Sequence, residues 1–229
     1  MSGEGPSHYP VMLDIAGRLA VVVGGSAAAL RTARSLAKHG ADVVVITPDV
    51  STELMNLEAD GVLTIEPRGY VRGDLQNAML VVAASGSAET DAAIVDEARE
   101  RNALVNVQSD GAKSDFIVPS VVRRGDLQIA VSTAGKAPSV AKQVRRGIAR
   151  AHGEEYGPYV QLVADLRALA VARTGMSEAE LAPLFDFVTA SDVLFRLHGG
   201  ESVTAESVYD AYVASLAEKP AEGMKFSDE

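Results

Sequence analysis

Residues 18–107 alternate short runs of β-branched residues with stretches of helical character. This alternation is typical of a parallel sheet whose strands are connected by helices that cover both faces. Most of the runs are continuously apolar, as expected for strands buried on both sides. We predict strands at Leu19–Val23, Val43–Thr47, Val62–Ile65, Met79–Ala83 and Leu104–Val107, and helices at Ala28–Lys38, Ser51–Leu57 and Ala88–Arg101. The fold class is therefore α/β, with a Rossmann-like doubly wound parallel sheet.

The pattern changes after Asp110. Phe116–Val122 and Leu127–Ser132 have the character of two strands, because the sequence Arg-Arg-Gly-Asp between them is a turn signal. A helix is expected from about Ala137 to Ala151. The rest of the chain has apolar residues at helical spacing, which predicts helices only.

Three parts follow from these patterns. We predict a nucleotide-binding Rossmann domain over residues 1–113, a small strand-strand-helix segment over residues 114–152, and a helical C-terminal domain over residues 153–229. In the last part, Ser177 and Glu180 have the spacing of a capping box, which marks the start of a helix.

The composition excludes several classes of protein. None of the 229 residues is a cysteine, which rules out disulfides, thiolate nucleophiles and Cys-ligated metal centres. The four histidines are scattered without ligand spacing, so no metal site is predicted. No apolar run approaches a membrane span and no signal peptide is recognisable, so a cytoplasmic location without membrane contact is expected. Met1–Ser7 and Lys219–Glu229 are rich in Gly, Pro, Ser and charge, and we expect them to be poorly ordered.

One segment has a charge opposite to that of the whole chain. Lys113–Arg150, called the basic segment below, holds eight basic and two acidic residues in a chain of net charge −10. A local cationic surface attracts polyanionic ligands, and a small polycarboxylate fits better than a nucleic acid, which usually goes with a basic domain. We therefore expect no nucleic acid partner and take Lys136, Lys142 and Arg146 as candidate substrate-binding residues. The alternative is that they form only the solvated face of a helix.

A glycine-rich turn, Gly24 to Ala29, follows the first predicted strand and opens a helix. This is the context of the dinucleotide fingerprint G-x-G-x-x-G/A, in which a helix N-terminus binds the pyrophosphate. Gly24 can make the tight turn, but Ser26 stands where the fingerprint has its middle glycine. Its side chain would crowd the phosphate and weaken binding about ten- to a hundredfold. The turn predicts either a nucleotide site or only close packing of strand on helix.

Asp49 follows the second predicted strand. An acidic residue at about this distance from the turn binds a ribose hydroxyl in many dinucleotide sites. Asp49 could equally supply the negative charge at the start of the next helix.

Several segments together resemble one known family. They are Tyr9–Asp14, Val22–Gly25 with Ala29 and Arg31, Val81–Ser85, Asn106–Val107, Phe116–Ser120, Ala130–Thr133 and Gly135–Pro138. Over about residues 9–170 the chain resembles the precorrin-2 dehydrogenase family, the N-terminal region of siroheme synthases. The last three segments are the most specific.

The resemblance implies an NAD-dependent oxidation of precorrin-2 to sirohydrochlorin, in some members combined with iron insertion by ferrochelatase activity. It also implies a homodimer formed through residues 114–152 and a substrate that is an octacarboxylate macrocycle, which suits the basic segment. The implied cofactor contacts are Gly24, Gly25, Ser26, Ala27, Ala28, Pro48, Asp49 and Ser85. Ser120 and Thr133 join the candidate substrate-binding residues.

The resemblance also places a catalytic Asp three residues after Asn106, but that position is Ser109. A carboxylate follows one residue later, at Asp110. Serine is a poor general base without a partner, whereas a carboxylate can accept a proton. We therefore predict Asp110 as the catalytic residue. Two alternatives stay open: a catalytically degenerate homologue that binds a tetrapyrrole or a partner enzyme, and a chelatase that has lost dinucleotide binding.

Overall fold

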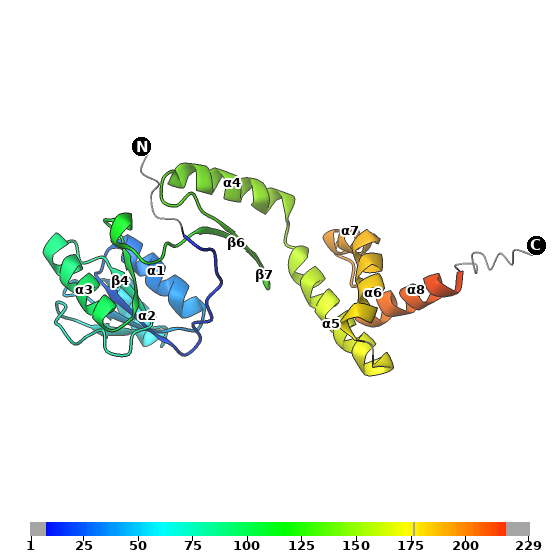
Figure 1. Ribbon diagram of the computed structural model, residues 1–229, viewed down its shortest axis with the longest axis horizontal. Coiled ribbons are helices and arrows are strands. Elements are labelled where there is room, and N and C mark those ends of the chain that lie inside the picture. Colours follow the sequence, from blue (N-terminus) through cyan, green and yellow to red (C-terminus); the bar gives the residue numbers. More distant parts are fainter. Residues whose placement is uncertain (1–7, 176, 219–229) are drawn as a thin grey trace, which may run out of the picture. The chain divides into compact units, whose positions relative to one another are not determined.

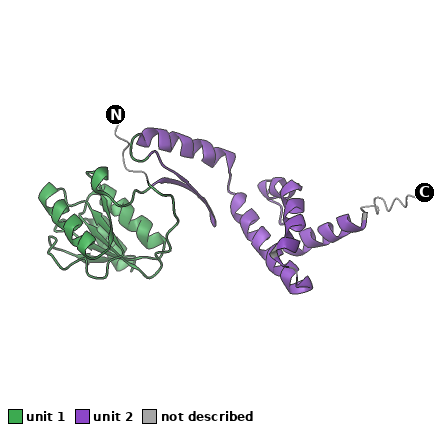
Figure 2. Cartoon of the chain, in the orientation of Figure 1, with its two compact units in different colours: residues 1–118, 134–136 green, residues 119–133, 137–229 purple. Residues whose placement is uncertain are grey.

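The computed structural model describes residues 8–175 and 177–218. The chain forms two compact units (Figures 1 and 2), one of residues 1–118 with 134–136 and one of residues 119–133 with 137–229. The termini that we expect to be poorly ordered, residues 1–7 and 219–229, lie outside the described residues. Among the described residues, no helix is both long and apolar enough to span a membrane.

The first unit is built on a parallel sheet of five strands in the order β3-β2-β1-β4-β5. Its strands are β1 Leu19–Val23, β2 Asp42–Ile46, β3 Thr64–Glu66, β4 Leu80–Ala83 and β5 Leu104–Val107. Its helices are α1 Ala27–Lys38, α2 Thr52–Ala59 and α3 Ala88–Glu100. Each lies within two residues of its predicted bounds, and the doubly wound parallel sheet is confirmed.

The central strand shows why the runs are continuously apolar. Ala20 and Val22 face a core that α1 and α2 cover, whereas Val21 and Val23 face a second core that α3 covers. All four side chains are buried, because successive residues of a strand point to opposite faces and both faces are covered here. The sheet is therefore a rigid platform whose carboxyl-end loops can carry a site.

The second unit begins with an antiparallel hairpin of β6 Ser120–Arg124 and β7 Leu127–Val131, followed by α4 Pro138–Ala151. The turn between the strands contains Gly125, whose φ of +56° is unfavourable for other residues. The predicted start of the first strand at Phe116 was wrong. Asn106 Nδ2 donates to the carbonyl oxygen of Phe116 at 2.9 Å and holds that segment beside β5.

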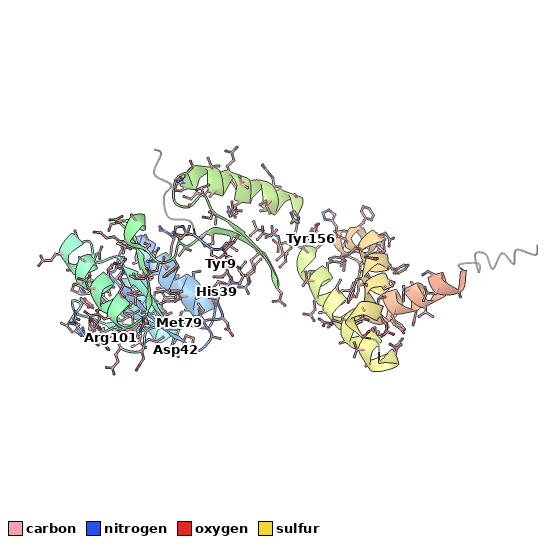
Figure 3. The ribbon with its side chains drawn as sticks, viewed as in Figure 1. Tyr9, His39, Asp42, Met79, Arg101 and Tyr156 are labelled. Atoms are coloured by element: carbon pink, nitrogen blue, oxygen red, sulfur yellow. The ribbon has the colours of Figure 1, made fainter. Side chains whose placement is uncertain are left out.

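Four helices complete the second unit: α5 Tyr156–Thr174, α6 Glu178–Ala190, α7 Val193–His198 and α8 Ala205–Glu218. They pack around a core that includes Leu166, Leu181 and Leu184. The predicted capping box of Ser177 starts α6 and is confirmed. At the start of α5, the ring of Tyr156 (Figure 3) lies 4.9 Å from the ring of His152, which ends α4.

Candidate active site

A cavity of about 560 Å³ lies at the carboxyl ends of β1, β2 and β4. From β1 the chain continues outward through β2 and β3 on one side, and then crosses back to β4 and β5 on the other side of β1. The cavity therefore lies where strand order reverses, which is where doubly wound folds bind ligands. A larger hollow of about 840 Å³ lies at the amino ends of β2 and β3. We place the site in the smaller cavity, because the carboxyl-end loops carry the ligand sites in such sheets.

Six of the eight predicted cofactor contacts line this cavity, namely Gly24, Gly25, Ser26, Pro48, Asp49 and Ser85. Ala27 and Ala28 form the first turn of α1 and are not among the lining residues. Sequence reasoning missed Gly69 and Tyr70, which line the cavity from the loop between β3 and β4.

The two glycines of the turn are required by close packing. Gly24 has a φ of +125°, and a Cβ there would lie 2.0 Å from the carbonyl oxygen of Ala84. A Cβ on Gly25 would lie 2.8 Å from the carbonyl oxygen of Asp49. The turn is therefore wedged between the ends of β2 and β4, and its backbone forms the floor of the cavity.

Ser26 is the N-cap of α1. Its Oγ accepts a hydrogen bond from the backbone N–H of Ala29 at 3.1 Å, which is the usual function of serine at this position. The first turn of α1 has no acidic residue, so the positive end of the helix is available to an anion. That Ser26 crowds a bound pyrophosphate stays a prediction.

The end of β2 presents an exposed carboxylate. Thr47 is buried, and its Oγ1 accepts a hydrogen bond from the backbone N–H of Asp49 at 3.2 Å. This contact fixes the backbone, while the Asp49 side chain is exposed at the cavity.

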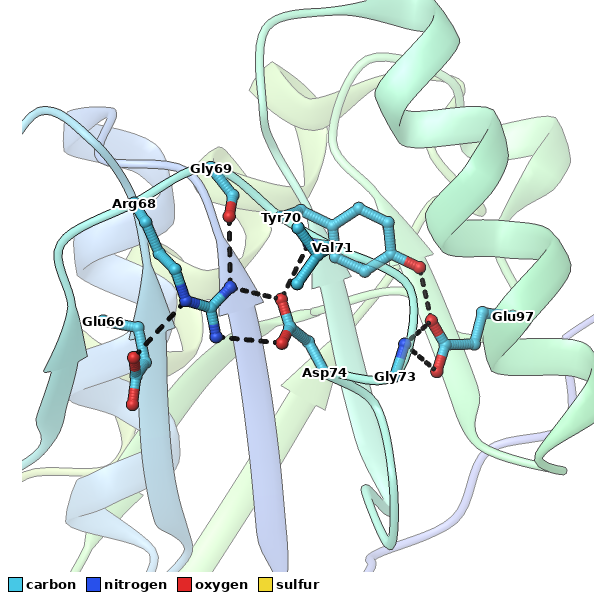
Figure 4. A network of polar contacts seen from close by, with 8 residues as sticks. All are labelled: Glu66, Arg68, Gly69, Tyr70, Val71, Gly73, Asp74 and Glu97. Atoms are coloured by element: carbon cyan, nitrogen blue, oxygen red, sulfur yellow. Dashed lines mark hydrogen bonds and ion pairs between the residues drawn. The ribbon is translucent and has the colours of Figure 1, made fainter.

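Two carboxylates hold the loop that carries Tyr70 (Figure 4). Asp74 binds the guanidinium of Arg68 through two hydrogen bonds of 2.8 and 2.9 Å, and the hydrogen bond from Arg68 lowers the pKa of Asp74. The hydroxyl of Tyr70 donates a hydrogen bond to Glu97 Oε2 at 2.5 Å. Burial and this contact with Glu97 raise the pKa of Tyr70. The ring of Tyr70 is thus held as a fixed wall of the cavity.

Glu97 is a fully buried acid whose donors include a cation. It is 1% exposed and accepts hydrogen bonds from Tyr70 Oη, from the N–H of Gly73 and from Arg101 Nε. Burial would raise the pKa of Glu97, but these donors outweigh it and the pKa is lowered.

The loop after β5 holds the two residues that the resemblance left in question. Asp110 is the N-cap of the short 3₁₀ helix η1, Gly111–Lys113. Its Oδ1 accepts from the N–H of Ala112 at 3.0 Å, and its Oδ2 lies 3.6 Å from Lys113 Nζ. Ser109 is exposed, and its hydroxyl donates to Asp91 Oδ2 at 3.4 Å. That Asp110 is catalytic stays a prediction.

Asp91 is a functional candidate that sequence reasoning missed. It lies near the start of α3 and is 6% exposed. A signal was present, because Asp91 shares the apolar face of its predicted helix with Ile94, Val95 and Ala98. An acid at such a position must be buried, and a buried acid is a candidate for function.

The predicted substrate-binding residues lie in or beside the second unit. Lys142 and Arg146 are exposed, one turn apart on α4, and Lys136 is exposed in the turn before it. No ion pair is found for these three within the described part of the chain. Ser120 begins β6, and Thr133 Oγ1 accepts from the N–H of Ala137 at 3.1 Å. Their contact with substrate stays a prediction.

Known protein families match segments of both units. A family described as NAD(P)-binding matches residues 11–120, and one described as sirohaem biosynthesis protein central matches residues 124–151. The precorrin-2 dehydrogenase of Priestia megaterium is 31% identical over 161 residues, which cover 70% of this chain and 79% of that one. The chain belongs to the precorrin-2 dehydrogenase family. The resemblance inferred from the sequence is thereby confirmed.

Two further likenesses extend the match. A solved structure, SirC, precorrin-2 dehydrogenase, superposes with a TM-score of 0.73 at 26% identity, covering 90% of this chain and 100% of that one. The siroheme synthase of Azotobacter vinelandii is 31% identical over 212 residues, 93% of this chain and 46% of that one. The chain spans about half the length of such siroheme synthases. Because the chain belongs to this family, its first unit is a domain that binds a nicotinamide cofactor.

Proposed function

We propose that this protein oxidises precorrin-2 to sirohydrochlorin with NAD as the acceptor, in siroheme biosynthesis. The observation that carries the proposal is the cavity at the strand-order reversal, lined by six of the predicted cofactor contacts in a chain of this family. The cofactor, when bound, supplies the hydride chemistry, and the protein supplies orientation, charge and a proton acceptor.

The residues of the cavity fit a dinucleotide. Gly24 and Gly25 let the turn pack tightly against the ends of β2 and β4. The start of α1, whose first turn has no acidic residue, can then offer its backbone N–H groups to a pyrophosphate. Asp49 favours NAD over NADP, because its exposed carboxylate would accept a hydrogen bond from a ribose 2′-hydroxyl and repel a 2′-phosphate. Calorimetry with the two cofactors tests this preference, and Asp49→Asn should narrow it.

We further propose that the carboxylates of the macrocycle bind to Lys136, Lys142 and Arg146, with Ser120 and Thr133 as polar contacts. The support is that the three cationic side chains are exposed and without ion pairs in the described residues. Asp110, half-exposed in the loop after β5, is the catalytic candidate predicted from the sequence, one residue after the position at which the resemblance places an Asp.

A cytoplasmic homodimer is also proposed. A two-stranded hairpin is marginal by itself, and β6–β7 leaves Val121 41% exposed while α4 leaves Val140 47% exposed. A second copy could cover these side chains. Sedimentation equilibrium should give twice the chain mass, and a monomer at micromolar concentration would refute the dimer.

The deciding experiment is anaerobic incubation of the purified protein with precorrin-2 and NAD. We expect NADH and sirohydrochlorin to appear in equal amounts, and the absorbance of each product measures its formation. Binding of NAD and macrocycle without turnover would instead support the catalytically degenerate homologue. Absence of NAD binding, measured by calorimetry, would remove the proposed reaction altogether.

A further inference from the structure

Asp91 is a buried carboxylate that does not line the proposed dinucleotide cavity, although it accepts hydrogen bonds from Ser85, which does. It is 6% exposed, and its hydrogen bonds come from two serines. Within residues 8–175 and 177–218, no lysine, arginine or histidine pairs with it. A buried charge without a cation is costly, and proteins keep such groups mainly where they serve function.

The two oxygens of Asp91 have different surroundings. Oδ1 accepts from both the backbone N–H and the hydroxyl of Ser85, at 3.1 and 2.7 Å. In the described part of the chain, Oδ2 accepts only from the hydroxyl of Ser109, at 3.4 Å. Ser85 therefore fixes the carboxylate through one oxygen and leaves the other directed at Ser109.

Ser109 is exposed at the carboxyl end of β5, whereas Asp91 is shielded from any substrate. A serine hydroxyl becomes an effective base when a second group can take its proton. Asp91 is positioned to do so. The carboxylate of Asp110, by contrast, caps its own 3₁₀ turn and approaches Lys113.

We propose that Ser109 is a catalytic residue for the oxidation and that Asp91 is the positioning residue that receives its proton. The inference rests on the proposed function. In the oxidation the substrate loses one hydrogen with its electron pair to the cofactor and a second hydrogen as a proton. That proton bonds to Ser109 Oγ, while the hydroxyl proton of Ser109 passes to Asp91 Oδ2 and is later released to water.

The first test compares turnover with binding. Ser109→Ala and Asp91→Asn should each lower kcat about a hundredfold or more, the usual contribution of a general base. The dissociation constants for NAD and sirohydrochlorin should change less than threefold. The double variant should lose little more than either single one, because the two residues act as a unit. Asp96→Asn, an exposed acid on the same helix, is the matched control.

The second test moves the carboxylate. Asp91→Asn combined with Ser109→Asp keeps the charge and a hydrogen bond between the two positions but places the acid where substrate can reach it. This variant should recover at least a tenth of the wild-type kcat. Recovery separates a chemical role from a structural one, since a change that only damaged the fold would not be reversed.

A readout without turnover keeps this inference distinct from the proposed reaction. The ¹³C resonance of the Asp91 carboxyl should move in Ser109→Ala and stay in Asp96→Asn, whether or not the wild type oxidises precorrin-2. An unmoved resonance overturns the pairing. A fast Ser109→Ala enzyme beside a slow Asp110→Ala enzyme overturns the proton route and returns the role to Asp110.

Discussion

Helix α3 carries two acids that are both buried but have different hydrogen-bond donors around them. Glu97, in its second half, receives hydrogen bonds from a tyrosine, a backbone N–H and the cation of Arg101. Asp91, near its start, receives hydrogen bonds from Ser85 and Ser109 and, among the residues that the structure describes, from no others. The first arrangement anchors a loop, and the second leaves a charge for chemistry. The difference shows that the donors around a buried carboxylate, more than its burial, indicate its role.

The largest expected effect is the loss of stability when the anchoring carboxylate of Glu97 is removed. Glu97→Ala would leave Tyr70, Gly73 and Arg101 without their acceptor, so unfolding free energy should fall by about 3–5 kcal/mol in urea denaturation. Glu100→Ala, which removes the exposed partner of Arg72, should have a far smaller effect, because solvent screens this exposed pair. Equal losses would contradict the assignment of Glu97 as an anchor.

A smaller effect, on ligand binding, is expected when the basic side chains on and just before α4 are neutralised. Arg124 is a structural cation, because it donates to the carbonyl oxygens of Ala149 and His152. Lys142 and Arg146 have no ion pair in the described residues. Neutralising Lys136, Lys142 and Arg146 together should raise the dissociation constant for sirohydrochlorin roughly tenfold. The salt dependence of binding should shrink as well, and an unchanged salt slope would return these residues to a solvated face.

The anchoring role of Glu97 should also appear in the pH dependence of stability. The pKa of Glu97 is lowered in the folded protein, so its contribution is present above the unfolded value of about 4.3 and is lost as pH falls through the folded value. Glu97→Gln should therefore flatten the decline in unfolding free energy below about pH 4.5. An unchanged acid limb in a titration of stability would speak against the anchor.

The smallest expected change is in the stability of Asp91→Asn. The amide oxygen can still accept from Ser85, so unfolding free energy should fall by about 1 kcal/mol. A loss as large as that of Glu97→Ala would mean that Asp91 is a second anchor.

The sequence was sufficient for the sheet and for the dinucleotide turn, because both depend on local patterns. Short, mostly apolar runs located all five strands, and Gly24 with Asp49 located the cavity. The contacts of Asp91 and Tyr70 could not be predicted in the same way. Asp91 meets Ser109 from 18 residues away, and Tyr70 meets Glu97 from 27 residues away, so both pairs depend on tertiary packing.

The start of β6 was wrongly predicted at Phe116 for a similar reason. The apolar run favours a strand, but a side-chain hydrogen bond from Asn106 holds the segment beside β5. Serine at position 26 departs from the fingerprint, yet its capping hydrogen bond with the Ala29 N–H is a local contact that serine favours at the start of a helix. The contact between Asn106 and Phe116, by contrast, joins residues ten positions apart and cannot be predicted from local propensity.

Helix α3 holds both an anchor and a proton acceptor, and measuring stability together with turnover distinguishes the two roles. Unfolding free energy and kcat should be measured on the same preparations of Asp91→Asn and Glu97→Gln. We expect Asp91→Asn to lose about a hundredfold in kcat and little stability, and Glu97→Gln to lose several times more stability and less than tenfold in kcat. If both variants lose turnover and stability in the same proportion, the two acids share one structural role and Asp91 is not a proton acceptor.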